Sequence, residues 1–274
     1  MLNTALAVEN ILVVKLGGGA GLDIAASCDD LSRLAQNRPI VVVHGVSDLA
    51  NQMCVEAGIP VRTITTPTGH SSRYTDLQTR AVYVQAAESA NRELVERLNE
   101  LGVDAVGLSG DDTLIHGERK SAIRAVVEGR VRVIRDDYSG SINGVDSDRL
   151  LELLEQGRTP VIAPMAMSAD GLLNVDGDRA AAAVAVALRA EELVILSNVR
   201  GLYRSFGDKN SFVHQVSTGQ LETAMEWAQG RMKRKVLGAG EALAGGVRRV
   251  VISDGRTINP VQQALAGAGT VFSR

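Results

Sequence analysis

The chain has few cysteines, no long apolar run and no strong excess of charge of either sign. Its two cysteines, Cys28 and Cys54, lie neither in a CxxC pair nor at a metal-binding spacing from a histidine. They predict reduced thiols and exclude a disulfide framework. The formal net charge of −3 over 274 residues gives no basic field that would attract nucleic acid nonspecifically.

The first ten residues, MLNTALAVEN, have neither a basic start nor a long apolar segment, so no secretory signal is visible. No run approaches the roughly 18 apolar residues of a membrane span. We therefore expect a cytoplasmic protein with neither a membrane nor a nucleic-acid partner.

Short apolar runs recur along the chain and alternate with helical patterns. The runs cover residues 11–16, 40–45, 105–110, 159–164, 193–198 and 249–254. The helical patterns cover residues 76–101, 146–157, 178–190, 217–225 and 233–245. Continuous apolar runs are typical of parallel strands covered on both faces, and the alternation predicts an α/β fold. No repeat or proline-rich linker divides the chain, so we expect one continuous sheet with two functional halves.

The first run, ILVVKLGGGAG (residues 11–21), carries a lysine at the mouth of a glycine turn. Without a Cβ, Gly17 and Gly18 let backbone N–H groups approach an anion closely. The familiar phosphate loop places its lysine after the glycines, whereas Lys15 precedes them on the strand. Lys15 is predicted to point at the same anion. The next strand ends in HGVSD, a second small-residue turn, where His44 is expected to be buried and hydrogen-bonded rather than a metal ligand.

Two later segments add charge to the same edge of the sheet. In LLNVDGDR, Asn174, Asp176 and Asp178 alternate along an extended turn, and Asp178 is placed as a helix cap or first-turn carboxylate. In QGRMKRK (residues 229–235), four basic residues crowd the start of a helix, where the helix dipole disfavours cations. A nearby anion would account for them.

Residues 117–140 break this pattern and predict two short strands around Glu128-Gly129. The stretch 117–135 holds six basic and two acidic residues. It fits either a solvated hairpin or a docking surface for an acidic partner, and the sequence leaves both open.

Phosphoryl transfer to a carboxylate fits this set of residues. No Ser/His or Cys/His dyad stands out, and none is needed, because a side-chain carboxyl with a pKa of about 4.3 is already ionised at neutral pH. The obstacle is repulsion between the carboxylate and the γ-phosphate, which cations and N–H donors remove.

The motifs VVKLGGG, VHG, SRYTD, NVDGD, LSNVRGL, GRMKRK and GTV together resemble the amino-acid kinase family, and within it the N-acetylglutamate kinase group, over essentially the whole chain. GLSGDD, RDDYSG and GRMKRKV are most similar to the branch that phosphorylates L-2-aminoadipate attached to a small acidic carrier protein, LysW, in lysine biosynthesis. The resemblance implies a three-layer αβα sandwich. It places the acyl substrate and a homodimer interface on the N-terminal half (about 1–165) and ATP on the C-terminal half (about 166–274).

The resemblance also implies residue roles. Lys15 and Lys235 would flank the transferring phosphoryl group, and Asp178 would orient both. Gly18 and Gly45 would donate N–H groups to it, while Arg73 would hold the substrate α-carboxylate and Asn174 its other end. The implied substrate-binding set is Gly17, Gly18, Gly45, Val46, Arg73 and Asn174. The implied ATP-binding set is Asn198, Val199, Arg200, Gly201, Leu202, Tyr203, Trp227, Ala228 and Gln229.

Mg²⁺ would neutralise the β- and γ-phosphates without a direct protein ligand. The basic stretch would dock the carrier through Arg119, Lys120, Arg124, Arg130 and Arg132. Two positions depart from the family. Val46 replaces the second glycine of the HGG turn, so the approach to its N–H would be more crowded if that N–H contacts the substrate. Asn198 replaces a frequent aspartate of the nucleotide turn, which removes a negative charge near ATP.

Other functions stay open from the sequence. One is N-acetyl-L-glutamate 5-kinase of arginine biosynthesis, and another is a kinase for carrier-linked glutamate, whose substrate lacks one methylene, a difference worth only about 1–3 kcal/mol in a pocket. A nucleotide-binding regulator without catalysis, or a plain binding module for an acidic protein, would have no need of intact Lys15, Asp178 and Lys235.

Overall fold

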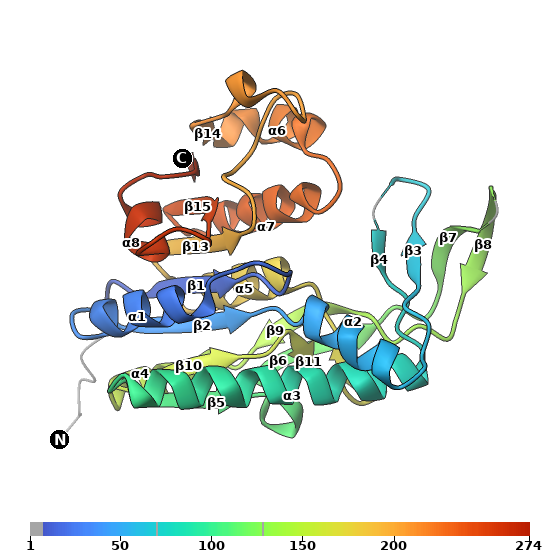
Figure 1. Cartoon of the computed structure of the whole chain (residues 1–274), viewed down its shortest axis with the longest axis horizontal. Helices are drawn as coiled ribbons and strands as arrows, with labels where there is room; N and C mark the ends of the chain where they lie inside the picture. Colours follow the sequence, from blue (N-terminus) through green and yellow to red (C-terminus); the bar gives the residue numbers. More distant parts are fainter. Residues whose placement is uncertain (1–7, 70, 128) are drawn as a thin grey trace.

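The computed structural model describes residues 8–69, 71–127 and 129–274. An eight-stranded sheet with the order β14-β16-β15-β13-β1-β2-β10-β5 runs through it (Figure 1). Its strands are β1 (Leu12–Leu16), β2 (Ile40–His44), β5 (Ala105–Leu108), β10 (Thr159–Ile162), β13 (Glu192–Ser197), β14 (Gln215–Ser217), β15 (Arg249–Asp254) and β16 (Thr270–Ser273). The six strands predicted from the sequence all pair in parallel, which confirms the mainly parallel sheet. Only β15 and β16 pair antiparallel within this sheet of the described chain.

Helices cover both faces of the sheet. They are α1 (Ile24–Ala35), α2 (Ser47–Glu56), α3 (Leu77–Glu100), α4 (Ser147–Glu155), α5 (Gly177–Ala187), α6 (Leu221–Trp227), α7 (Met232–Ala244) and α8 (Pro260–Leu265). The 3₁₀ turns are η1 (Gly110–Asp112), η2 (Lys209–Ser211) and η3 (Thr218–Gln220). Helices α1, α3 and α8 pack in one core cluster with one face of the sheet, and α4, α5 and α7 pack in another with the opposite face. The predicted three-layer αβα sandwich is confirmed.

The pleat of strand β1 determines the face of the sheet on which Lys15 lies. Leu12, Val14 and Leu16 pack toward α1, α3 and α8, whereas Val13 packs toward α5 and α7. Because side chains alternate along a strand, Lys15 shares the face of Val13. The lysine therefore points toward the helices that carry the other charged residues of the site.

All five predicted helices are present, with shifted ends; the predicted helix at 217–225 is η3 followed by α6. Helices α1, α2 and α8 were not predicted. Helix α2 has no side-chain cap at Val46 and buries only Ala50 and Cys54, so its sequence carries a weak periodic signal.

Two hairpins project beyond the sheet (Figure 1). One pairs β3 (Thr63–Thr65) with β4 (Ser71–Arg73), and the other pairs β7 (Ile123–Val127) with β8 (Arg130–Ile134). The expected hairpin at 117–140 is too long, because residues 117–119 belong to β6 (Ile115–Arg119), which pairs with β9 (Gly140–Val145). A short pair, β11 (Met165–Ala166) and β12 (Leu173–Asn174), completes the strands. Of the predicted turn, Glu128 lies outside the described residues.

Among the described residues, every helix is too short or too polar to span a bilayer.

Candidate active site

Three buried charges meet at the carboxyl end of β1. Lys15 Nζ lies 2.9 Å from Asp178 Oδ1, and Lys235 Nζ lies 3.0 Å from Asp178 Oδ2. The residues come from β1, α5 and α7, so three separate elements fix one carboxylate between two ammonium groups. The expected juxtaposition of Lys15, Asp178 and Lys235 is present.

The sequence around α5 explains this geometry. Asp176 caps the helix, because its Oδ1 accepts the N–H groups of Asp178 and Arg179 at 3.0 and 3.1 Å. Asp178 is therefore the first-turn residue rather than the cap, and its carboxylate stays available for the lysines. A Cβ on Gly238 of α7 would lie 3.1 Å from the Asp178 carbonyl oxygen, so this glycine permits the close packing of the two helices that brings Lys235 within reach.

The cluster has more positive than negative charge. Burial raises the pKa of Asp178, but the charges and hydrogen bonds of Lys15 and Lys235 outweigh it and hold that pKa well below its ordinary value. Burial lowers the pKa of Lys235; the Asp178 carboxylate opposes this change, and Lys15 adds to it. The aspartate neutralises only one of two ammonium charges, so an anion placed between them would be stabilised.

A cradle of backbone N–H groups lies beside the cluster. A Cβ on Gly18 would lie 2.2 Å from the Val46 nitrogen, and one on Gly45 would lie 2.5 Å from the Gly18 nitrogen, so the two turns touch only because both residues are glycine. The Gly45 N–H donates to the Leu16 carbonyl oxygen at 2.8 Å. The Gly45 N–H therefore already has an acceptor within the fold, and its donation to the phosphoryl group stays a prediction.

Two further N–H groups lie at the cradle, one of them the predicted Gly18 and the other Val46. Within the described chain, the backbone N–H groups of Gly18 and Val46 have no protein acceptor. The Val46 side chain is buried against Ala50 and Tyr83 rather than directed at the cradle. Crowding of the substrate near Val46 stays a prediction.

His44 lies directly behind this turn. Its Nε2 lies 3.1 Å from Asn91 Nδ2, whose N–H groups also donate to the Val161 carbonyl oxygen at 2.8 Å. Burial lowers the pKa of His44 to about 4; the Gly45 carbonyl opposes the change and the charge of Lys15 adds to it. The prediction of a buried, hydrogen-bonded histidine is confirmed, and the ring is neutral at physiological pH.

A cleft of about 1820 Å³ opens over the cluster and the cradle. Of the predicted substrate and nucleotide residues, it is lined by Gly17, Gly18, Gly45, Val46, Arg73, Asn174, Asn198, Val199, Gly201, Leu202, Tyr203, Trp227 and Gln229. Arg200 and Ala228 are not among its lining residues. The Arg200 guanidinium lies 4.4 Å from the Phe212 ring centroid, and Ala228 is buried in the core.

Arg73 brings an unsatisfied cation to the cleft. Its Nη2 donates to the Ser47 carbonyl oxygen at 2.9 Å, while its buried Nη1 has no hydrogen-bond partner among the described residues. Asn174 lines the cleft and donates from Nδ2 to Thr75 Oγ1 at 2.9 Å. A buried guanidinium nitrogen without an acceptor fits a site for a carboxylate.

The five residues predicted to dock a carrier divide into separate groups. Arg119 is held in the fold, with its guanidinium 3.9 Å from the Tyr138 ring centroid and hydrogen bonds to the Asp137 and Arg135 carbonyl oxygens. Its guanidinium is therefore already engaged within the fold, and its docking role stays a prediction. Lys120 lines the cleft, where partial burial and the charges of Arg179 and Arg234 lower its pKa against the opposing effects of Asp137 and Asp176.

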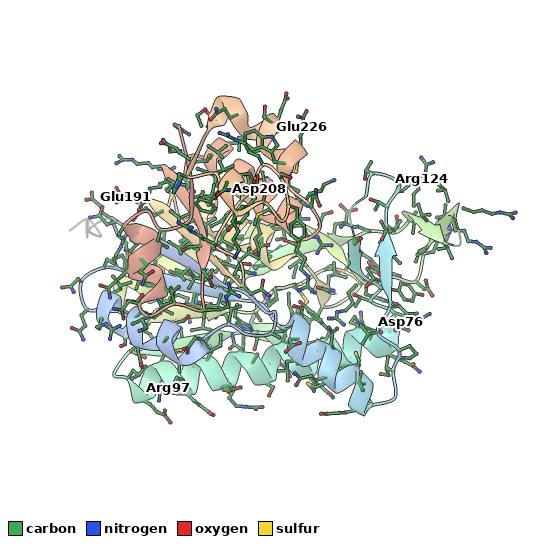
Figure 2. All side chains as sticks on the ribbon, turned by 45° about the horizontal axis from the view of Figure 1, so that its top comes forward. Asp76, Arg97, Arg124, Glu191, Asp208 and Glu226 are labelled. Atoms are coloured by element: carbon green, nitrogen blue, oxygen red, sulfur yellow. The ribbon has the colours of Figure 1, made fainter. Side chains whose placement is uncertain are left out.

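The other three lie on the hairpin β7–β8. Arg124 lines the cleft, and Figure 2 shows it on the projecting arm; Arg130 and Arg132 are exposed on β8. By the strand register, Arg124 shares one hairpin face with exposed Val126, Val131 and Val133. Arg130 and Arg132 share the other face with Ile123, Ala125 and Val127, which pack against Ile64 of β3. The exposed arginines of the hairpin are therefore divided between its two faces.

Sequence reasoning missed several residues of the cleft wall. They include Phe206, Lys209, Arg231 and Leu237. Arg231 belongs to the basic run whose position at a helix start indicated an anion, so a signal for it existed. Phe206 lies in a loop with no recognisable pattern.

Comparisons with known proteins agree with this geometry. A sequence model described as the amino acid kinase family matches residues 10–254. A protein of Deinococcus radiodurans named LysW-aminoadipate kinase is 45% identical over 270 residues, which cover 97% of this chain and 92% of that protein. A Thermus thermophilus protein with the same name is 41% identical over 267 residues, covering 95% of this chain and 99% of that one.

Solved structures show the same fold. N-acetylglutamate synthase from Neisseria gonorrhoeae, complexed with coenzyme A and N-acetylglutamate, superposes with a TM-score of 0.78 at 25% identity; the match covers 97% of this chain and 59% of that one. This chain thus spans less than two thirds of the synthase. Carbamate kinase from Giardia lamblia bound to AMP-PNP superposes with a TM-score of 0.67 at 15% identity, over 98% of this chain and 99% of that one.

Proposed function

The chain belongs to the amino acid kinase family, and from this we propose that it transfers the γ-phosphoryl group of ATP to the side-chain carboxylate of L-2-aminoadipate carried on LysW. The product would be an acyl phosphate, and the pathway lysine biosynthesis. The observation that carries the proposal is the cluster of Lys15, Asp178 and Lys235, two buried ammonium groups on one carboxylate beside a cradle of N–H groups.

The cluster supplies what carboxyl phosphorylation needs. A carboxylate nucleophile requires no base, so the main barrier is repulsion between two anions. Lys15 and Lys235 would lie on either side of the transferring group, and Asp178 would hold both ammonium groups at fixed positions. The N–H groups of Gly18 and Val46 would donate to the phosphoryl oxygens. Asp178 would stay ionised throughout, because the lysines hold its pKa low.

ATP would be bound by groups of the protein, whereas Mg²⁺ would be bound mainly through ATP. A Cβ on Gly18 or Gly45 would clash with the backbone of the other turn, so both glycines let the two turns meet beside the lysines, where an anionic phosphate would bind. Among the described residues, no group of three His, Cys, Asp or Glu side chains could hold a metal ion. Mg²⁺ would therefore be bound chiefly by the phosphates of ATP, where it supplies charge neutralisation. The C-terminal turn 198–203, with Trp227 and Gln229, would hold the rest of the nucleotide.

The acceptor would lie mainly on the N-terminal half of the chain, with one contact from Asn174 just beyond it. The unsatisfied Nη1 of Arg73 supports binding of the substrate α-carboxylate, and Asn174 would bind its other end. A homodimer would form through the same half, which exposes Val55 on α2 and Leu77 at the start of α3. The acceptor site and the homodimer interface are both implied by the family and are part of the proposal.

The carrier would dock at the mouth of the cleft. The D. radiodurans and T. thermophilus relatives carry LysW in their names. Lys120 and Arg124 line the cleft, and Arg130 and Arg132 extend the positive charge along the hairpin β7–β8. An acidic carrier would be steered toward this side by the field of these residues.

Acyl-phosphate formation, trapped as the hydroxamate, tests the proposal. Three acceptors would be compared with ATP and Mg²⁺: carrier-linked aminoadipate, carrier-linked glutamate and free N-acetylglutamate. We expect product with carrier-linked aminoadipate. Product with N-acetylglutamate alone would place the chain in arginine biosynthesis and leave the hairpin as a solvated surface.

A further inference from the structure

The protein is poor in aromatic residues, and they are unevenly distributed. The sequence holds three phenylalanines, four tyrosines and one tryptophan. Tyr203, Phe206, Phe212 and Trp227 all fall within residues 203–227, in the half of the chain assigned to the nucleotide. Tyr203, Phe206 and Trp227 line the cleft.

Two of these cleft rings are already in contact with protein groups. The Tyr203 ring packs edge-on against Phe212, with centroids 5.2 Å apart. The Trp227 ring packs against the core and lies 5.5 Å from the Arg204 guanidinium carbon. Phe206 differs, since it is 79% exposed and has no ring or cation partner among the described residues. An exposed aromatic side chain on the wall of a cleft is a common feature of ligand sites.

The loop that carries Phe206 is held by its own hydrogen bonds. Ser211 Oγ accepts the Ser205 N–H at 3.1 Å and donates to the Ser205 carbonyl oxygen at 3.0 Å. The Asp208 N–H donates to the same carbonyl oxygen at 3.2 Å, and Gly207 between them adopts φ +91°. Phe206 is thus presented at the tip of a closed loop, next to Asp208 (labelled in Figure 2). This arrangement limits the conformational entropy that the loop would lose on binding.

We propose that Phe206 stacks on the purine base of the bound nucleotide and is a positioning residue for ATP. The inference deepens the proposed function and rests on it. The acceptor carboxylate site at Arg73 lies on the other half of the chain, so the base is the part of the two substrates that offers an aromatic face to Phe206. Stacking would orient ATP without contributing to the charge balance at Lys15 and Lys235.

Isothermal titration calorimetry on the full chain tests this inference without any acceptor. The ligands are Mg-ATP and Mg-tripolyphosphate, which carries the phosphate chain but no base. The variants are Phe206→Ala, Phe206→Tyr and, as a matched control, Ile258→Ala. Ile258 is 78% exposed, like Phe206, but does not line the cleft.

Phe206→Ala is expected to raise the Kd for Mg-ATP by about tenfold, the effect of losing one base–aromatic stack, and to leave the Kd for Mg-tripolyphosphate unchanged. Phe206→Tyr and Ile258→Ala should bind both ligands like the wild type. An unchanged Kd for Mg-ATP in Phe206→Ala would overturn the inference, and so would an equal loss for both ligands, which would indicate a general change in the loop. Failure of the wild type to bind Mg-ATP would instead refute the proposed function itself.

Discussion

The buried cluster of Lys15, Asp178 and Lys235 and the hairpin β7–β8 both concentrate charge, but they hold it in opposite ways. In the cluster, each charge is out of water and fixed by a partner on another element. On the hairpin, Arg124, Arg130 and Arg132 are exposed and make no ion pair within the described chain. Buried charges act strongly over fixed distances, whereas exposed charges act weakly, at longer range and under screening by salt. The difference suits chemistry in the first region and recognition of a large partner in the second.

The largest expected effect comes from removing the shared carboxylate. Asp178→Asn would leave Lys15 and Lys235 buried beside each other without a counter-charge, so we expect the free energy of unfolding to fall by about 3–5 kcal/mol. Urea unfolding measures this loss. The double variant Asp178→Asn/Lys235→Met, which removes one of the stranded cations, should regain part of the stability. No regain would show that the aspartate acts through something other than charge.

The second prediction separates catalysis from stability in the same cluster. Lys235→Met leaves Asp178 paired with Lys15, so stability should change little, while kcat should fall by about 10²–10³-fold because a transition-state cation is lost. The hydroxamate assay under saturating substrates measures it. Lys233→Met is the matched control: it lies two residues away on α7 and does not line the cleft. Equal losses in both variants would contradict the assignment.

The third prediction extends the comparison to pH. The pKa of His44 is about 4 in the folded protein, against an ordinary 6.5. Between pH 6.5 and 4 the unfolded chain therefore binds a proton that the folded chain does not. The free energy of unfolding should therefore fall as pH is lowered from 6.5 to 4, by on the order of 3 kcal/mol, and this contribution should level off below pH 4. His44→Gln should flatten the curve, whereas exposed His214→Gln should not. Identical slopes in wild type and His44→Gln would exclude the histidine as the cause.

The smallest effect is expected on the hairpin. Reversal of charge in Arg124→Glu/Arg132→Glu should raise KM for the carrier-linked substrate by about tenfold at low ionic strength, and kcat and KM for ATP should stay unchanged. Arg248→Glu, a reversal at a site far from the hairpin in sequence and outside the cleft wall, is the control. Arg119→Glu should lower the melting temperature instead, since Arg119 packs on Tyr138. An unaltered KM in the hairpin variant would remove the docking role.

The sequence was sufficient where one strand or one turn determines the outcome. The apolar runs predicted the six parallel strands, and the glycine turn after the first run was enough to predict that Lys15 lies at an anion site. Prediction from the sequence failed where a contact joins residues that are far apart along the chain. The choice of Val46 over Gly45 as an N–H donor depends on which N–H the Leu16 carbonyl accepts. Nothing in the sequence indicated that the Arg119 guanidinium packs on the ring of Tyr138, so Arg119 was predicted to be free for docking. Phe206 could not be predicted as a site residue, because its place on the cleft wall depends on the folded chain.

The central claim is that the buried cluster carries out the chemistry and the hairpin β7–β8 recognises the carrier. The salt dependence of wild-type kinetics with two acceptors tests it most directly. These are carrier-linked aminoadipate and a small N-acyl aminoadipate that lacks the carrier. For the carrier-linked acceptor, kcat/KM should fall as salt rises while kcat stays constant, and the small acceptor should show much weaker salt dependence. A kcat/KM that is equally insensitive to salt for both acceptors would contradict the account.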